Sequence, residues 1–183
     1  GMKPDIVVAS KVITAGFFPM GAIILSSEMT ERVEKACAKY EELPTGFTTG
    51  AHPVGCAIAM ASLDEILDGG AFANVKKVSP LFQKRLAAMS DHPMVGEARG
   101  VGLMGALEMV ANKQTKAAFA GNLDVSERVS RQALRNGLIC RPLGQAVILA
   151  PPFIINEPQI DELFSILRRT LDEVYSGIQS KAA

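Results

Sequence analysis

A single lysine, Lys11, stands between two apolar runs near the start of the chain. Residues 4–10 are apolar and β-branched after a turn signal, which predicts a short buried strand, and residues 22–25 begin a second strand. A lysine amine that is kept away from water gives up its proton more readily. The neutral amine is a nucleophile that forms Schiff bases with carbonyl compounds. A solvated surface lysine is the alternative that spacing alone leaves open.

A run rich in glycine and threonine, residues 43–53, precedes a predicted helix that starts at Pro53. Backbone N–H groups and threonine hydroxyls in such a loop suit an anion such as phosphate, especially next to a helix N-terminus. A plain capping loop is the alternative. We interpret His52 as a structural residue at the helix start rather than as an acid or base.

An arginine, Arg141, ends the first strand of a predicted hairpin over residues 138–153, whose turn is Pro142-Leu143-Gly144. A guanidinium at such a place can hold a carboxylate through two parallel hydrogen bonds. From the residues alone, a surface arginine in a structural ion pair is the favoured interpretation.

The glycines between Gly96 and Gly105 could suggest a phosphate-binding loop. No helix start follows them as a dinucleotide-binding motif requires, so we attribute them to tight turns within a strand pair over residues 95–108. The three cysteines, Cys37, Cys56 and Cys140, are scattered and have no metal-ligand spacing, so neither a metal site nor a disulfide framework is expected.

The composition is that of an ordinary globular protein, with 183 residues, 48% of them hydrophobic. The 19 basic and 19 acidic residues balance, which gives no reason to expect nucleic acid or an anionic membrane as a partner. No apolar run is long enough to span a membrane, and the cysteine usage favours the cytoplasm. Gly1-Met2 looks like the scar of a cleaved tag.

Hydrophobic periodicity predicts helices over residues 28–42, 53–68, 72–89, 124–135 and 157–178. Pro80 should kink the third of these helices or mark a boundary. We therefore expect two domains, residues 1–79 and residues 80–183.

The lysine segment, residues 5–22, resembles that of the class III aminotransferases, pyridoxal-phosphate enzymes that include ω-amino acid–pyruvate transaminases. The resemblance rests on a proline–aspartate pair, a strand, the lysine and a glycine turn, with matches at Lys11, Gly16, Pro19, Gly21 and Ala22. It implies an α/β structure, the PLP-dependent aminotransferase fold type I. Residues 1–79 correspond to the end of the large, mainly parallel-sheet domain and the linking helix, and residues 80–183 to the small α+β C-terminal domain.

The resemblance also implies roles for individual residues. Lys11 corresponds to the lysine that binds pyridoxal 5'-phosphate as a Schiff base and later moves protons. Thr48, with Phe47 before it, corresponds to the threonine that contacts the cofactor phosphate of the neighbouring subunit, so a homodimer is expected. The Thr49-Gly50-Ala51 run departs from the tyrosine–serine–glycine that is common in the family. Arg141 corresponds to the arginine that binds the substrate carboxylate.

The implied reaction moves an amino group between an amino donor, an ω-amino acid or amine, and a keto acid such as pyruvate. The family's aspartate that pairs with the pyridine nitrogen lies upstream of the lysine, where this sequence has no corresponding region, so the chain alone is expected to be inactive or a poor catalyst. A class III aminomutase or decarboxylating relative, a non-catalytic dimerisation module and a product of an incomplete gene remain alternatives.

Overall fold

The computed structural model describes residues 1–42 and 46–182, so the first three residues of the predicted glycine–threonine loop lie outside the described part. The chain divides into two compact units, Gly1–Gly70 and Ala71–Ala183. The boundary expected after residue 79 falls instead inside one helix, α3 (Ala71–Ala88), which contains Pro80. Pro80 is exposed, and a proline removes only one backbone donor from a helix, so α3 continues through it. The Gly69-Gly70 break precedes the helix, with Gly70 at φ 87°.

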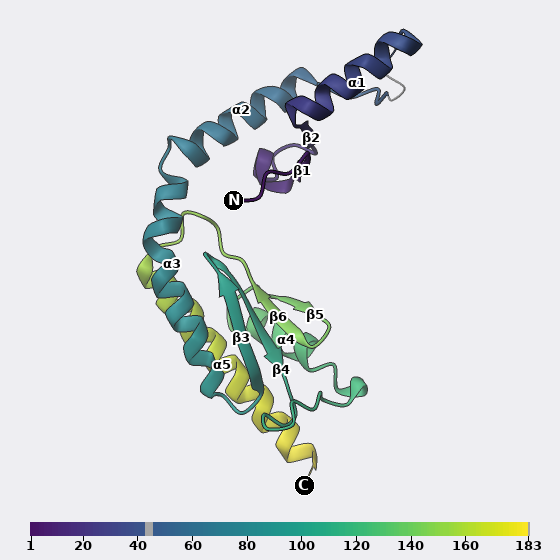
Figure 1. Cartoon of the computed structure of the whole chain (residues 1–183). Helices are drawn as coiled ribbons and strands as arrows, with labels where there is room; N and C mark the ends of the chain where they lie inside the picture. The colour runs from purple at the N-terminus through teal and green to yellow at the C-terminus, as the bar shows by residue number, and fades with distance from the viewer. Residues whose placement is uncertain (43–45, 183) are drawn as a thin grey trace. The chain divides into compact units, whose positions relative to one another are not determined.

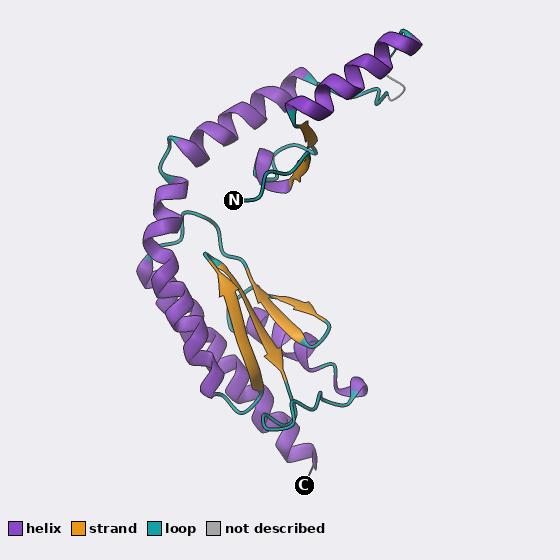
Figure 2. Cartoon of the chain, viewed as in Figure 1, coloured by secondary structure: helices purple, strands orange, loops and turns teal. Residues whose placement is uncertain are grey.

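The first unit begins with a two-stranded antiparallel ribbon in which Ile6 pairs with Leu25 and Ser10 pairs with Gly21 (Figure 2). Its elements are β1 (Ile6–Ser10), the 3₁₀ turn η1 (Lys11–Thr14), β2 (Gly21–Leu25), α1 (Ser27–Tyr40) and α2 (Pro53–Leu67). Both predicted strands are confirmed. Their predicted burial is wrong for the described chain, because two strands cannot cover each other's faces, and Val8 and Ile23 are exposed.

The two helices of the first unit begin as their sequences predict, within one residue. The hydroxyl of Ser26 accepts a hydrogen bond from the amide of Met29 at 3.3 Å, so Ser26, and not Ser27, caps α1. Pro53 occupies the first turn of α2, where a missing N–H group is tolerated. The buried residues of α2 are Gly55 and Ala59, and most of its surface is open.

The second unit is a four-stranded sheet covered by helices (Figure 1). The strand order is β3-β4-β6-β5, and every described strand pair in the chain is antiparallel. This is the α+β arrangement expected for the C-terminal part. After α3 and the short turn η2 (Met89–Asp91), its elements are β3 (Val95–Val101), β4 (Met104–Met109), the turn η3 (Gly121–Leu123), α4 (Val125–Arg135), β5 (Arg141–Leu143), β6 (Ala146–Leu149) and α5 (Glu157–Ala182).

One hydrophobic core joins the helices α3, α4 and α5 to one face of this sheet. In Figure 1, α3 and α5 run side by side along the strands. Alternate residues of each strand point into the core, such as Leu107 in β4 and Val147 in β6. Their neighbours along the same strand face the other side of the sheet. No helix in the described residues has both the length and the hydropathy that crossing a bilayer requires.

The glycines of the β3–β4 hairpin have two different functions in the structure. Gly102 has a φ of 60° and makes the turn, as expected. Gly100 and Gly105 pair across the strands and lie under α3. A Cβ at Gly105 would lie 2.9 Å from a methyl carbon of Leu86 and 3.2 Å from the Phe82 ring. Tight turning alone therefore does not explain these glycines, because two of them make room for a helix.

Candidate functional site

Lys11 is the first residue of η1, directly after β1, and its backbone has a φ of 56°. This left-handed conformation costs a residue other than glycine about 1–2 kcal/mol, so the surrounding structure must hold it in place. The side chain is exposed, so the described residues do not form the desolvated setting that the sequence predicts. Within the described residues Lys11 has no ion pair or side-chain hydrogen bond.

Two side-chain hydrogen bonds hold the turn that carries Lys11 in place. The hydroxyl of Thr14, which is 1% exposed, donates a hydrogen bond to the carbonyl oxygen of Phe18 at 2.6 Å. The hydroxyl of Ser62 on α2 donates to the carbonyl oxygen of Val12 at 3.2 Å. Sequence reasoning missed both residues, because each acts through a contact and carries no chemistry that its type alone would reveal.

Phe47 and Thr48 lie in a tight turn that leads into α2. The amide of Gly50 donates to the carbonyl oxygen of Phe47 at 2.7 Å, and Phe47 is 80% exposed. Thr48 is exposed, and in the described part of the chain its hydroxyl has no hydrogen-bond partner. His52, four residues after Thr48, is the N-cap residue of α2, and its side chain makes no capping hydrogen bond. A free hydroxyl beside an uncapped helix N-terminus suits an anionic group such as phosphate.

Arg141 is the first residue of β5, on the face of the sheet opposite the core. Cross-strand pairs place it in one row with Ile148, Ala106 and Arg99. Arg99 is already neutralised, by Glu108 at 3.0 Å and by Glu97 at 3.5 Å. Among the described residues Arg141 has no such partner, so its guanidinium is available to a carboxylate.

Cys140, next to Arg141, is a structural residue. It is buried, and burial raises the pKa of its thiol, which therefore stays protonated and unreactive. Ser130 on α4 donates a hydrogen bond to the carbonyl oxygen of Cys140 at 2.8 Å. This bond fixes the backbone immediately before Arg141.

The structure brings Lys11, Phe47 and Thr48 into the first unit and leaves Arg141 in the second. Lys11 lies on a turn packed against α2, and Thr48 lies on the loop before that helix. In residues 1–42 and 46–182 there is no group of three or more His, Cys, Asp or Glu side chains that could hold a metal ion.

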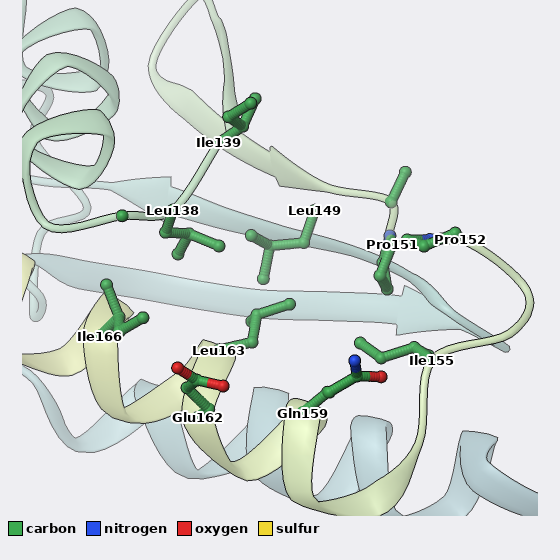
Figure 3. Close-up of a pocket in the computed structure, with 12 residues that line it drawn as sticks. Leu138, Ile139, Leu149, Pro151, Pro152, Ile155, Gln159, Glu162, Leu163 and Ile166 are labelled. Carbon is green, nitrogen blue, oxygen red and sulfur yellow. The ribbon is translucent and has the colours of Figure 1, made fainter.

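A groove of about 470 Å³ in the second unit contains none of these residues (Figure 3). It lies between the start of α5 and the segments that flank the β5–β6 hairpin, and its walls are mainly aliphatic, with Leu138, Leu149 and Leu163 among them. Gln159 and Glu162 supply the polar side chains of its lining. The groove offers no nucleophile and no cation, so we do not assign the chemistry to it.

Comparison with known proteins matches the family described as aminotransferase class-III to residues 1–171. The putrescine–pyruvate aminotransferase of Pseudomonas aeruginosa is 36% identical over 179 residues, which make up 97% of this chain and 38% of that protein. The mitochondrial gamma aminobutyrate transaminase 1 of Solanum lycopersicum is 32% identical over 97% of this chain and 35% of its own length.

Solved structures give the same picture. An ω-aminotransferase from Paracoccus denitrificans superposes with a TM-score of 0.95 at 48% identity, over 97% of this chain and 39% of that one. A PMP-bound aminotransferase from Vibrio fluvialis superposes with a TM-score of 0.93 at 49% identity, over 96% of this chain and 39% of that one. The chain thus spans about two fifths of the length of these relatives.

Proposed function

Because this chain belongs to the class III aminotransferases, which are pyridoxal-phosphate-dependent enzymes, we propose that the protein moves an amino group between an amino donor and a keto acid. The observation that supports the proposal is the exposed side chain of Lys11 on a left-handed turn, in the segment that resembles the lysine segment of the family. The described residues fit the cofactor, since they offer an amine for its aldehyde and a hydroxyl with a helix N-terminus for its phosphate.

Lys11 is the proposed catalytic residue. When bound, pyridoxal phosphate supplies an electron sink for the substrate carbon that carries the amino group. The Lys11 amine would hold the cofactor through its aldehyde. When it is not bound to the cofactor, the same amine would move a proton between the reacting carbons, as base and then as acid.

Phe47 and Thr48 are the proposed phosphate-binding residues, and they act on the cofactor of a second subunit. The Thr48 hydroxyl is unpaired in the described chain, which leaves it free to donate to a phosphate oxygen. This arrangement makes the functional protein a homodimer.

Arg141 is the proposed receptor for the substrate carboxylate. Its guanidinium is exposed and unneutralised in the described part of the chain, unlike that of Arg99 in the same row of the sheet. The names of the relatives favour a terminal amine or ω-amino acid as donor and pyruvate as acceptor. We place the reaction in the cytoplasm, where the three unpaired cysteines would stay reduced.

The test follows the cofactor's absorbance in the protein loaded with pyridoxal phosphate. An amine donor should convert the spectrum, and pyruvate should restore it. Arg141→Ala should leave the step with an uncharged amine unchanged and raise the pyruvate concentration for half-maximal recovery by about 10- to 100-fold, the loss of a charge-assisted hydrogen bond.

Arg99→Ala is the matched control, because it removes a neutralised arginine from the same face of the sheet. It should leave the pyruvate dependence within about twofold. In a protein that also has the region upstream of the lysine that the relatives have, cofactor bound at Lys11 without a response to any amine would contradict transamination. An Arg141→Ala variant that matches the parent would remove Arg141 from the site.

A further inference from the structure

We propose that Phe18 and His52 are positioning residues that join the turn carrying Lys11 to the loop carrying Thr48. The inference rests on the proposed function, because it gives these two segments their shared cofactor chemistry. Neither ring touches a group assigned to the reaction. Their effect is on the backbone that presents Lys11 and Thr48.

The first observation is the contact between the two rings. Their centroids lie 5.4 Å apart, and the ring planes are tilted by 36°. Gly55, in the first turn of α2, makes room for this contact, since a Cβ there would lie 2.7 Å from Cε1 of Phe18. Phe18 is thus packed directly on the start of α2, beside His52.

The contact leads back to Lys11 through the turn. The carbonyl oxygen of Phe18 accepts the hydrogen bond of the buried Thr14, and the amide of Phe17 donates to the carbonyl oxygen of Thr14 at 2.9 Å. At the other end, Ser62 bonds to Val12, the residue after Lys11. The turn is therefore attached to α2 at two places, through Gly55 and through Ser62. Two attachments can maintain the left-handed conformation of Lys11 against its strain.

The contact also leads forward to Thr48. His52 is the N-cap residue of α2, and its side chain makes no capping hydrogen bond, so its ring is used for the contact with Phe18. Thr48 lies inside the tight turn that ends two residues before His52. A hollow of about 370 Å³ lies between residues 18–21 and the loop before α2, and Phe18, Phe47 and His52 are among the residues that line it.

In the proposed dimer, Lys11 serves one cofactor and Thr48 of the same chain serves the other. Phe18 and His52 then join parts of two active sites within one subunit. A change at either ring should loosen the Lys11 turn and weaken phosphate binding together, although neither residue reaches the cofactor.

The first test needs no cofactor. Amide hydrogen exchange of the chain is measured at Ala15 and Phe17, whose amides are hydrogen-bonded within the turn. Phe18→Ala and His52→Ala should each speed this exchange about 3- to 10-fold, as the loss of an aromatic contact would. His52→Phe, which keeps a ring, should restore the parent rate.

Phe17→Ala is the matched control, because Phe17 is adjacent and 83% exposed. It should leave the exchange at Ala15 unchanged. If His52→Ala loses protection throughout residues 1–70, Phe18→Leu, which keeps an apolar contact, takes its place. Faster exchange at Ala15 alone in Phe18→Leu supports the proposal, and unchanged exchange there counts against it. Unchanged exchange in both Phe18→Ala and His52→Ala would overturn the proposal.

The second test adds pyridoxal phosphate and borohydride and maps the reduced label by peptide analysis. Phe18→Ala and His52→Ala should lower the share of label at Lys11 relative to the other lysines by about 3- to 10-fold, and His52→Phe should recover it. A parent chain without label at Lys11 would count against the proposed function, while the exchange measurement would still decide on the positioning residues.

Discussion

His92 is a buried histidine in the turn between η2 and β3, and its ring contacts α5. It is 1% exposed, and its Nδ1 accepts a hydrogen bond from the amide of Met94 at 3.2 Å. Its Nε2 lies 3.3 Å from Oδ1 of Asp172, and its ring meets the edge of Tyr175. Because Nδ1 is an acceptor, the neutral ring with a proton on Nε2 fits this environment. Protonation would break the bond to Met94.

We predict that acid destabilises the second unit through His92. Burial, reinforced by Arg168, lowers the pKa of His92 from its ordinary value of 6.5, and Asp172 and Asp91 oppose this. The folded form thus binds a proton less readily than the unfolded chain. Its stability is fully present above pH 6.5 and falls as the pH drops through the lower pKa of the folded form, by up to about 1.4 kcal/mol per pH unit.

Urea unfolding between about pH 7.5 and about pH 5.5, on either side of the ordinary histidine pKa, measures this effect. Tyr175 fluorescence reports on the second unit. Tyr40→Phe removes the other tyrosine of the chain, which lies in the first unit. His92→Asn is the matched variant, since an asparagine oxygen can accept from the amide two residues on without titrating. The His92→Asn chain should lose the pH slope. An equal slope in both chains would exclude His92 as its source.

At this scale, the sequence could predict the residues whose types carry chemistry. Lys11, Thr48 and Arg141 were assigned through the resemblance to the family, and their roles stay predictions. Thr14, Ser62 and the Phe18–His52 contact could not be predicted in the same way. Each depends on which segments meet in space. Gly55 makes room for this contact, because a Cβ there would clash with the Phe18 ring.

At the scale of elements, the paired glycines of the β3–β4 hairpin let α3 approach the sheet. Phe82 and Leu86 of α3 are fully buried over Gly105. We predict that Gly105→Ala lowers the free energy of unfolding by about 1–3 kcal/mol, because the added methyl group overpacks this contact.

Gly177→Ala on α5 is the control for this prediction. Nothing lies within 4 Å of a Cβ at Gly177, so alanine should stabilise the helix by about 0.5–1 kcal/mol. Chemical denaturation of the two variants measures both effects. A Gly105→Ala chain as stable as the parent would show that α3 can move away from the sheet without loss.

The helices were predictable because their caps and apolar periodicity are local features. The starts of α2 and α5 agree with the predicted positions, and α4 differs by one residue. The function of Gly100 and Gly105 was not predictable, because a tight turn and a close helix both call for glycine. The position of the division between the units was also missed, since Pro80 is as compatible with an exposed helix site as with a boundary.

For the whole molecule, the proposed dimer can be tested by mixing subunits that carry different substitutions. A Lys11→Ala chain keeps Thr48, and a Thr48→Ala chain keeps Lys11. If Thr48 acts on the partner's cofactor, a heterodimer of the two contains one intact site. Equal mixing with free exchange should then restore about a quarter of the parent's labelling at Lys11, because half of the dimers are mixed and each has one site in two.

Each variant alone is the control for the mixing experiment. If Thr48 acted on the cofactor of its own chain, no combination would contain an intact site, and mixing would restore nothing. Light scattering of the parent chain checks the assembly itself. A strictly monomeric parent that still labels at Lys11 would contradict the proposed role of Thr48.

The apolar residues of β1 and β2 are largely exposed in the described chain. The sequence predicted these strands as buried, and the structure leaves much of them exposed. Local pattern is enough to predict a strand, whereas its burial depends on whatever else packs against it. The chain spans about two fifths of the length of its relatives, so the sequence alone could not supply that information.

We propose that Lys11 binds pyridoxal phosphate covalently, and absorbance followed by borohydride reduction tests this. The protein is mixed with the cofactor, its visible absorbance is recorded, and the mixture is reduced with borohydride and mapped by peptide analysis. We predict a visible band and a label at Lys11 that disappears in Lys11→Ala. A label spread over the other lysines, and unchanged in Lys11→Ala, would contradict the account.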